Sequence, residues 1–358
     1  MSQVRLPPTA RGMDFVRLAI VTAIHDKNAE GAAATAARLW GPDSPAARIM
    51  NAGGLEMVEY EKANIVAGGT ISGNWAEPLA MFDDAAAEFF ALVRETSLIG
   101  RIPGLRKLPM QTRVVSALTG TSAAWVGEGQ AVPLSNATFA EDTLAPRKVS
   151  ALAVITDELA KSSDPRAEFV IRNDMVRAIA DAIDATFIDA ANSGTAGIKP
   201  ASVTNGADSI ASTGDGVQDI RNLIAGFPGD LQSAVLVGSG DSFAAMHDPI
   251  FMPGLGVRGG EALGIPAIPS EAAGTTLALI DPSGVAVAEW DMELRTSRQG
   301  TVEMKSDPSQ SSVAPTAVNQ VSLWQTNSVG IMTNQAINWE VTRPSVRVVT
   351  GVAPGAIS

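Results

Sequence analysis

The sequence predicts an α+β fold. Residues 164–191 place apolar side chains at helical spacing, and residues 111–156 are rich in strand-forming residues separated by turn residues. Residues 217–305 mix the two patterns without the regular strand–helix–strand alternation that a parallel α/β sheet requires. We therefore expect an α+β architecture in which no long strand–helix–strand regularity persists.

The N-terminal part predicts two helices within residues 11–40. An alanine-rich run over residues 29–40 stops at Gly41-Pro42, a pair that ends helices. Residues 41–78 are interrupted by glycine and proline, which favours an extended arm, and a short helix follows with one apolar face formed by Phe82, Ala86, Phe89 and Val93. A small separate helical domain over residues 11–50 is the alternative interpretation.

The central segment predicts strands that form a long hairpin. The expected strands are residues 112–118, 122–126, 138–144 and 147–156. Large apolar residues are scarce in this segment, and an isolated hairpin is at best marginally stable in water. The hairpin therefore needs a neighbouring surface on which to lie.

Residues 164–191 form the strongest predicted helix, about 40 Å long at 1.5 Å per residue. Asp164 is a favourable N-cap and Pro165 suits the first helical position. Its apolar stripe is Phe169, Val176, Ile179, Ile183 and Phe187, and its expected solvent side is Asp174, Arg177, Asp181 and Asp184. The polar, glycine-containing residues 192–216 indicate a domain boundary.

The C-terminal half predicts further short elements. The expected helices are residues 217–227 and 242–247, and the expected strands are residues 233–237, 264–269, 275–280, 284–289 and 345–350. Between Asp307 and Glu340 no residue is charged, yet amides such as Asn334 and Asn338 recur. A membrane span would not carry these amides, so we expect strands whose amides are buried against other subunits.

Composition excludes several classes of function. The chain has 358 residues, 46% of them hydrophobic, and a net charge of −12; no run of Lys or Arg is longer than two, which disfavours sequence-specific binding of nucleic acid. Without cysteine, disulfides and thiolate metal sites are impossible, and two histidines leave little for acid–base chemistry. Charged residues make up 18%, below the roughly 25% of an average soluble domain. Because interface cores are depleted of charge, we expect an oligomer, made in the cytoplasm, with no signal peptide and no membrane span.

Motifs that suggest chemistry have simpler interpretations. Residues 254–259 match the dinucleotide pattern G-x-G-x-x-G, but neither a strand before them nor a helix after them is expected. His25 and His247 each precede an aspartate without a positioned nucleophile, and we interpret both as ordinary residues at helix ends. The carboxylate pairs Asp157-Glu158 and Asp181/Asp184 are expected on hydrated faces. We therefore expect no catalytic, cofactor-binding or metal-binding residues, and no cofactor.

The order of several blocks resembles the major capsid proteins of tailed bacteriophages, which have the Hong Kong 97-type fold. The blocks are Trp125–Pro133, Leu144–Val149, Val154–Leu159 and Ser163–Pro165 with the long helix, supported by Leu98–Leu105, Ser322–Thr326 and Asn338–Pro344. The resemblance covers about residues 70–358. Each block alone is weak, but together they occur in the order of the family.

The resemblance implies a division of the chain into named parts. These are an N-terminal helical, scaffolding-like segment (1–66), an N-terminal arm (67–108), an extended loop (109–156), a peripheral domain (157–204) with a spine helix (164–191), an axial domain (205–325), and C-terminal strands of the peripheral domain (326–358). Some relatives also join a lysine of the extended loop to an asparagine of a neighbour. Asn327 is a conceivable acceptor, but no lysine occurs from Thr112 to Arg147.

The resemblance also implies a function and partners. Copies of the chain would assemble as hexamers and pentamers into an icosahedral shell around double-stranded DNA, without sequence-specific binding. Portal, scaffold or maturation protease, and decoration or head-completion proteins would be the other partners. The shell would be assembled in the bacterial host cytoplasm and located in the virion. An encapsulin-type compartment and, more remotely, a small-molecule enzyme are the alternatives.

Overall fold

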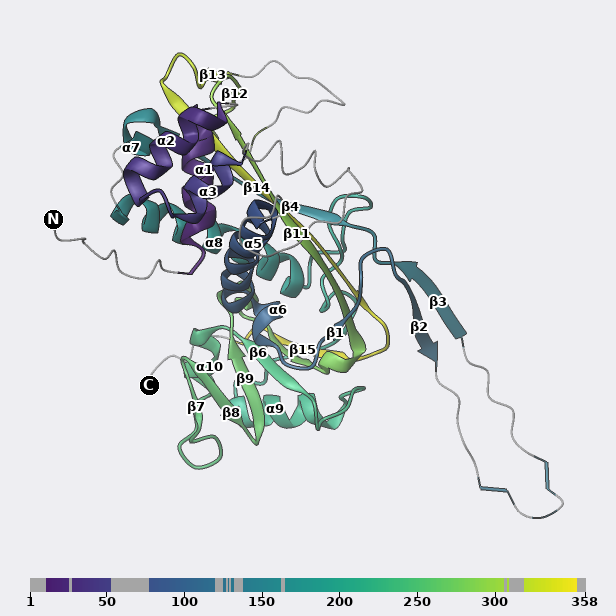
Figure 1. Cartoon of the computed structure of the whole chain (residues 1–358). Coiled ribbons are helices and arrows are strands. Elements are labelled where there is room, and N and C mark those ends of the chain that lie inside the picture. The colour runs from purple at the N-terminus through teal and green to yellow at the C-terminus, as the bar shows by residue number, and fades with distance from the viewer. Residues whose placement is uncertain are drawn as a thin grey trace. The chain divides into compact units, whose positions relative to one another are not determined.

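A computed structural model describes residues 11–25, 28–52, 77–119, 125–126, 128, 130–131, 138–161, 165–305, 308 and 319–352 (Figure 1). The chain forms two compact units. Unit 1 comprises residues 1–93, 150–179 and 291–335, and unit 2 comprises residues 94–149, 180–290 and 336–358.

Unit 1 is built mainly from helices. They are α1 (Met13–His25), α2 (Ala29–Trp40), α3 (Pro45–Asn51), most of α5 (Glu77–Thr96), α7 (Asp157–Lys161) and the first part of α8 (Pro165–Ile188). The short strands β12 (Thr301–Val302) and β13 (Val321–Ser322) pair in antiparallel register. Two caps explain where the small helices begin: Asn28 accepts a hydrogen bond from the Gly31 amide, and Ser44 accepts one from the Ala47 amide.

Unit 2 contains a seven-stranded mixed sheet with the order β5-β15-β10-β6-β9-β8-β7. The strands are β5 (Asp208–Ala211), β6 (Val235–Gly238), β7 (Leu255–Gly256), β8 (Gly259–Ala262), β9 (Ile265–Pro269), β10 (Leu277–Ile280) and β15 (Val346–Thr350). Helices α9 (Gly216–Ala225) and α10 (Gly240–Met246) contribute Ile220, Leu223 and Phe243 to the same core as Leu236 and Leu279 of the sheet. Two single 3-10 turns, Glu271–Ala273 and Pro282–Gly284, connect strands.

A second, four-stranded sheet has the order β1-β11-β14-β4. Its strands are β1 (Arg106–Lys107), β11 (Val285–Ser297), β14 (Ser328–Val341) and β4 (Arg147–Thr156), and β1 follows the short helix α6 (Leu98–Arg101). The pair β2 (Arg113–Thr119) and β3 (Thr138–Thr143) forms a separate antiparallel two-stranded sheet, visible at the right of Figure 1.

Several predicted elements are confirmed. The helices expected within residues 11–40 are α1 and α2, and the strongest predicted helix is α8. The expected helix at 217–227 is α9, and the expected strands at 264–269 and 345–350 are β9 and β15.

Three details of the sequence interpretation are wrong. Part of the expected arm is helical, because Ser44 and Pro45 start α3, and the expected short helix extends over the twenty residues of α5. Trp125 and Val126 are not in a strand, while the rest of the strand expected at 122–126 lies outside the described residues. The strand expected at 147–156 does form, but as β4 it belongs to the sheet of β14 rather than to the hairpin.

Candidate functional site

The two histidines are held at helix ends, as predicted. His25 is the last residue of α1, with its Nε2 2.7 Å from the Thr35 hydroxyl. His247 follows α10, and its Nδ1 lies 2.7 Å from the carbonyl oxygen of Leu255, to which a protonated nitrogen donates. Ser242, the serine nearest to His247 in sequence, is 1% exposed and shares a 2.8 Å hydrogen bond with the N-cap Ser239. Its hydroxyl therefore serves the start of α10.

The G-x-G-x-x-G sequence forms a strand pair. Residues 254–259 lead through β7 into β8, which pair in antiparallel register. Gly260 has a φ of 128°, and a Cβ there would lie 1.9 Å from the carbonyl oxygen of Gly254. Glycine is thus needed for close approach of two backbones, whereas a dinucleotide loop would need a helix N-terminus at this place.

Asp157 and Glu158, expected on a hydrated face, have different environments. Asp157 is 4% exposed and forms an ion pair with Arg298. Glu158 is exposed and accepts a 2.8 Å hydrogen bond from the Asn327 side-chain amide. The expectation is wrong for Asp157, because Arg298, distant in sequence, compensates its burial.

Asp184 is also buried, contrary to the expectation that it lies on the solvent side of α8. It is 7% exposed, its Oδ1 accepts a 2.6 Å hydrogen bond from the Leu98 amide at the start of α6, and Arg101 lies 3.6 Å from its Oδ2. Ser270 donates a 3.5 Å hydrogen bond to the same Oδ2. Burial raises the pKa of Asp184 to about 6, against the opposing effects of the Leu98 amide and Arg101.

The amide-rich strand β14 uses its polar side chains within the chain. Asn334 accepts a 2.7 Å hydrogen bond from the Ser150 hydroxyl and donates one of 3.0 Å to Glu293. Asn338 donates a 2.7 Å hydrogen bond to the carbonyl oxygen of Ala145. The expectation of buried amides is confirmed, but the partners of Asn334 and Asn338 are strands and loops of the same chain.

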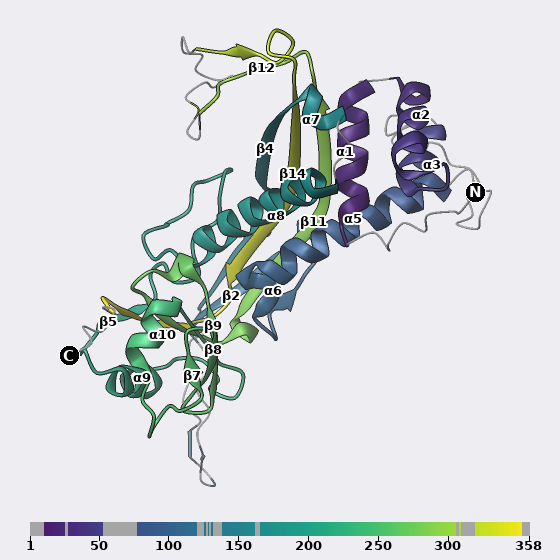
Figure 2. The ribbon, with the colours of Figure 1, turned by 90° about the vertical axis from the view of Figure 1, so that its left-hand side faces the viewer.

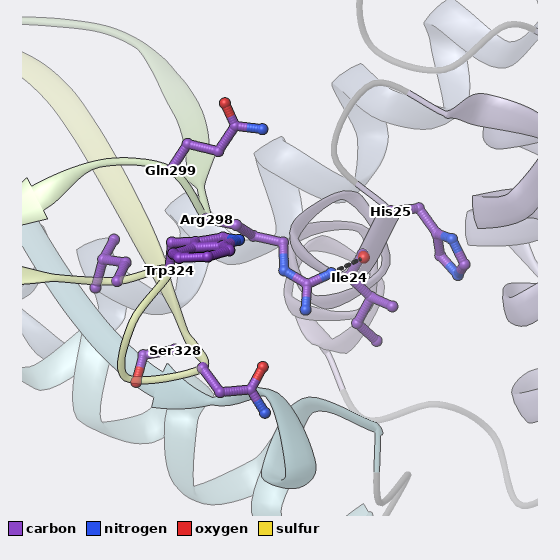
Figure 3. Close-up of a pocket in the computed structure, with 8 residues that line it drawn as sticks. Ile24, His25, Arg298, Gln299, Trp324 and Ser328 are labelled. Carbon is purple, nitrogen blue, oxygen red and sulfur yellow. Dashed lines mark hydrogen bonds between the residues drawn. The ribbon is translucent and has the colours of Figure 1, made fainter.

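A hollow of about 310 Å³ lies in unit 1 where α1 ends (Figure 3). It is lined by Ile24, His25, Arg298, Gln299, Leu323, Trp324, Asn327 and Ser328. The Arg298 guanidinium points at the end of α1, where it donates to the carbonyl oxygen of Ile24. Its lining combines the Arg298 guanidinium, the two amide side chains of Gln299 and Asn327, and a 76% exposed Trp324.

The hairpin β2–β3 exposes large apolar side chains. Val115 is 59% exposed and Trp125, in the connection between its strands, is fully exposed, whereas Val114 packs with Leu144 and Met110. Arg113 and Glu141 form an exposed ion pair of 3.2 Å across the hairpin. The described part of the hairpin thus has one small packed end and several large apolar side chains that this chain leaves in solvent.

Further exposed apolar side chains lie in the segments next to β7 and β8 of unit 2. They are Ile250, Phe251, Val257 and Leu263, which are 38–80% exposed.

Within the described residues, no three histidine, cysteine, aspartate or glutamate side chains are grouped so that they could hold a metal ion. The same residues include no helix whose length and hydropathy would allow it to cross a membrane.

Comparison with known proteins gives the family of the chain. Residues 83–346 match the model of the phage capsid family. The chain is similar to the "Capsid polyprotein" of Pseudomonas phage PAJU2, with 34% identity over 321 residues, which are 82% of this chain and 48% of the relative. It is also similar to the "Probable major capsid protein gp17" of Mycobacterium phage D29, with 26% identity over 120 residues, 33% of this chain and 36% of the relative. The chain thus spans about half of the first curated relative and about a third of the second.

A solved structure from Mycobacterium phage Ogopogo has the same fold. Its TM-score is 0.51 at 16% identity, with 71% of this chain and 91% of that chain covered. The predicted α+β fold of Hong Kong 97 type is confirmed. Together with the family match over most of the sequence, these similarities show that the chain belongs to the phage capsid family.

Proposed function

We propose that the chain is a major capsid protein whose copies assemble into the icosahedral head shell of a tailed phage or prophage. The observation that carries this proposal is the family match over residues 83–346. In this role the protein is structural and performs no catalysis.

The hairpin β2–β3 supports the proposal in physical terms. A two-stranded sheet is marginal in water unless a further surface covers it, and this hairpin exposes Val115 and Trp125. Aromatic residues that are exposed in a monomer and buried in an assembly supply much of the binding energy at protein interfaces. We assign the hairpin to the contact between neighbouring copies, as the extended loop of the shell protein.

The other parts of the chain are assigned to the parts of a Hong Kong 97-type capsid protein. The arm would lie within residues 67–108, the peripheral domain would contain α8 as its spine, and the axial domain would contain most of residues 205–325. The exposed residues Ile250, Phe251 and Val257 support contacts of the axial domain around the five-fold and six-fold centres, in pentamers and hexamers.

The remaining partners follow from the shell function. The shell would enclose double-stranded DNA without reading its sequence, in keeping with the net charge of −12. A portal, a scaffold or maturation protease, and decoration or head-completion proteins would bind the shell, which would be assembled in the host cytoplasm and located in the virion.

Assembly of the purified protein tests the proposal. Size-exclusion chromatography with light scattering at micromolar concentration, followed by electron microscopy, should find capsomer rings or closed shells. A monodisperse monomer of 37.0 kDa under conditions that promote assembly would contradict it. Shells that take up a protein cargo and exclude DNA in the host would indicate a compartment instead of a phage head.

A single substitution tests the role of the hairpin. Trp125→Ser removes a fully exposed aromatic side chain of the hairpin, and truncating such a residue at an interface costs about 2 kcal/mol or more. We expect the concentration needed for assembly to rise at least tenfold, with unchanged circular dichroism. The matched control is Trp324→Ser, which removes an exposed tryptophan outside the hairpin. Equal assembly of Trp125→Ser and the parent protein would refute the assignment of the hairpin.

A further inference from the structure

Helix α1 is apolar over most of its circumference, and its four polar residues are half-buried. Nine of its 13 residues are buried: Met13, Phe15, Val16, Leu18, Ala19, Ile20, Val21, Ala23 and Ile24. A helix with so wide an apolar surface needs cover on more than one side. Figure 2 shows α2 and α3 beside α1, with α5 and α7 also next to it, and these helices supply the cover.

The contact of α1 with α5 is both apolar and polar. The rings of Phe15 and Phe89 lie 4.8 Å apart between centroids, and both side chains are completely buried. Just before α1, the Gly12 amide donates a 3.1 Å hydrogen bond to Glu88 of α5. The N-terminal helices α1–α3 are therefore packed into unit 1 and do not form a separate small domain.

Two arginines from later parts of the chain hold the two ends of α1. Arg172 of α8 donates a 2.7 Å hydrogen bond to the carbonyl oxygen of Arg11, next to the start of the helix. Arg298, after β11, donates to the carbonyl oxygen of Ile24 in the last turn and also forms the ion pair with Asp157 of α7 (Figure 3). The last carbonyl groups of a helix lack partners within the helix, and cations are favourable there.

Arg298 is thus a junction between the N-terminal helices and the body of unit 1. It satisfies a helix terminus on one side and a 4% exposed carboxylate on the other. Removing it would take one ion-pair partner from the buried Asp157 and the guanidinium donor from the carbonyl oxygen of Ile24, and both losses weaken the same contact.

We propose that α5, α7, the start of α8 and the end of β11 form a docking face that binds the N-terminal helices without need of the covalent connection, and that Arg298 secures this binding. A chain cut between Ala52 and Glu77 then keeps residues of α1–α3 attached. This inference does not rest on the proposed function, because it concerns one chain and makes no use of shell assembly.

The test is scission of the full-length protein at an engineered site. A recognition sequence for a specific protease is inserted between Gly68 and Gly69, and the protein is cut under native conditions. Gel filtration of the product, with a denaturing gel of each fraction, should show the N-terminal fragment co-eluting with the remainder. Separate elution of the fragment from a remainder that keeps its circular dichroism would overturn the proposal.

Variants of the cut protein test the role of Arg298. Arg298→Met keeps the aliphatic stem and should reduce the retained fragment at least tenfold. The control Arg295→Met removes an arginine three residues earlier, in β11, that is 63% exposed and pairs with Glu293, and should retain the fragment like the parent. Because Arg298→Met takes an ion-pair partner from the buried Asp157, the double variant Asp157→Asn with Arg298→Met provides a chain that has no carboxyl group at this place. It too should lose the fragment. Full retention in the double variant would refute the role of Arg298.

Discussion

Asp184 makes the stability of the chain depend on pH in a way that one substitution removes. Its carboxyl group is buried between the start of α6, Arg101 and Ser270, with Asp181 as the neighbouring acid on α8. Burial raises its pKa from 3.8 to about 6. Because the folded chain then binds this proton more tightly than the unfolded chain, the free energy of unfolding increases as the pH falls through about 6 and levels off below the ordinary pKa.

The magnitude follows from the size of the shift. Two pH units correspond to about 3 kcal/mol between the fully protonated and fully ionised forms, and about 1.4 kcal/mol of this falls between about pH 7.5 and about pH 5. In Asp184→Asn the amide oxygen still accepts the Leu98 hydrogen bond, while no group titrates. The variant should therefore lose this increase of stability toward pH 5.

Urea denaturation at a fixed, low protein concentration measures the effect. The free energy of unfolding is determined from about pH 5 to about pH 7.5 for the parent, for Asp184→Asn and for the control Asp174→Asn, which removes an exposed acid of the same helix. The parent and the control should show parallel curves, and Asp184→Asn a flatter one. Parallel curves for all three proteins would refute the conclusion that the burial of Asp184 governs its ionisation.

Two further predictions concern covalent cross-linking in the assembled particle and DNA binding by the purified protein. The Asn327 side chain is hydrogen-bonded to Glu158, and no lysine occurs between Thr112 and Arg147, where a cross-link to a neighbour's asparagine would need one. Boiled particles should therefore give a single band near the monomer mass on a denaturing gel. A ladder of covalent oligomers would contradict this. DNA binding by the purified protein should be weak, independent of sequence and abolished by moderate salt, because the net charge is −12. Fluorescence anisotropy measures this binding. Sub-micromolar binding to one particular duplex at physiological salt would contradict the prediction.

The helices could be predicted from the sequence because their signals are local. Helix α8 begins at Pro165, a residue suited to the first turn, and α2 ends next to Gly41. Local spacing and these terminal residues therefore define both helices without reference to the rest of the chain. The partners of β4 and β15 could not be predicted in the same way. A strand pattern identifies a strand, but the choice of β14 for β4, or of β5 and β10 for β15, depends on segments far away in sequence.

The buried acids show the same limit for the site residues. On a helical wheel Asp184 lies outside the apolar stripe of α8. In the structure the start of α6 buries it, and the Leu98 amide donates a hydrogen bond to its carboxyl group. Asp157 precedes the exposed Glu158, and from the sequence both are expected to be hydrated. The ion pair between Asp157 and Arg298 becomes visible only in the folded chain. A serine or glutamine at these positions would have produced the same hydropathy pattern, so only the tertiary contact distinguishes a buried acid from a surface one.

These buried pairs bear on the low charge of the sequence, which we attribute to surfaces covered by other copies. Asp157, Asp184 and Asp281 are buried, and each faces an arginine: Arg298, Arg101 at 3.6 Å, and Arg343 at 2.7 Å. A chain with 18% charged residues that places some of them inside has still fewer for its surface. A soluble monomer would have only the remaining charges on its surface. In an assembly fewer surface charges are needed, because interface cores between subunits are depleted of charge. The interior use of these charges therefore strengthens the argument that much of the remaining surface is covered in an assembly.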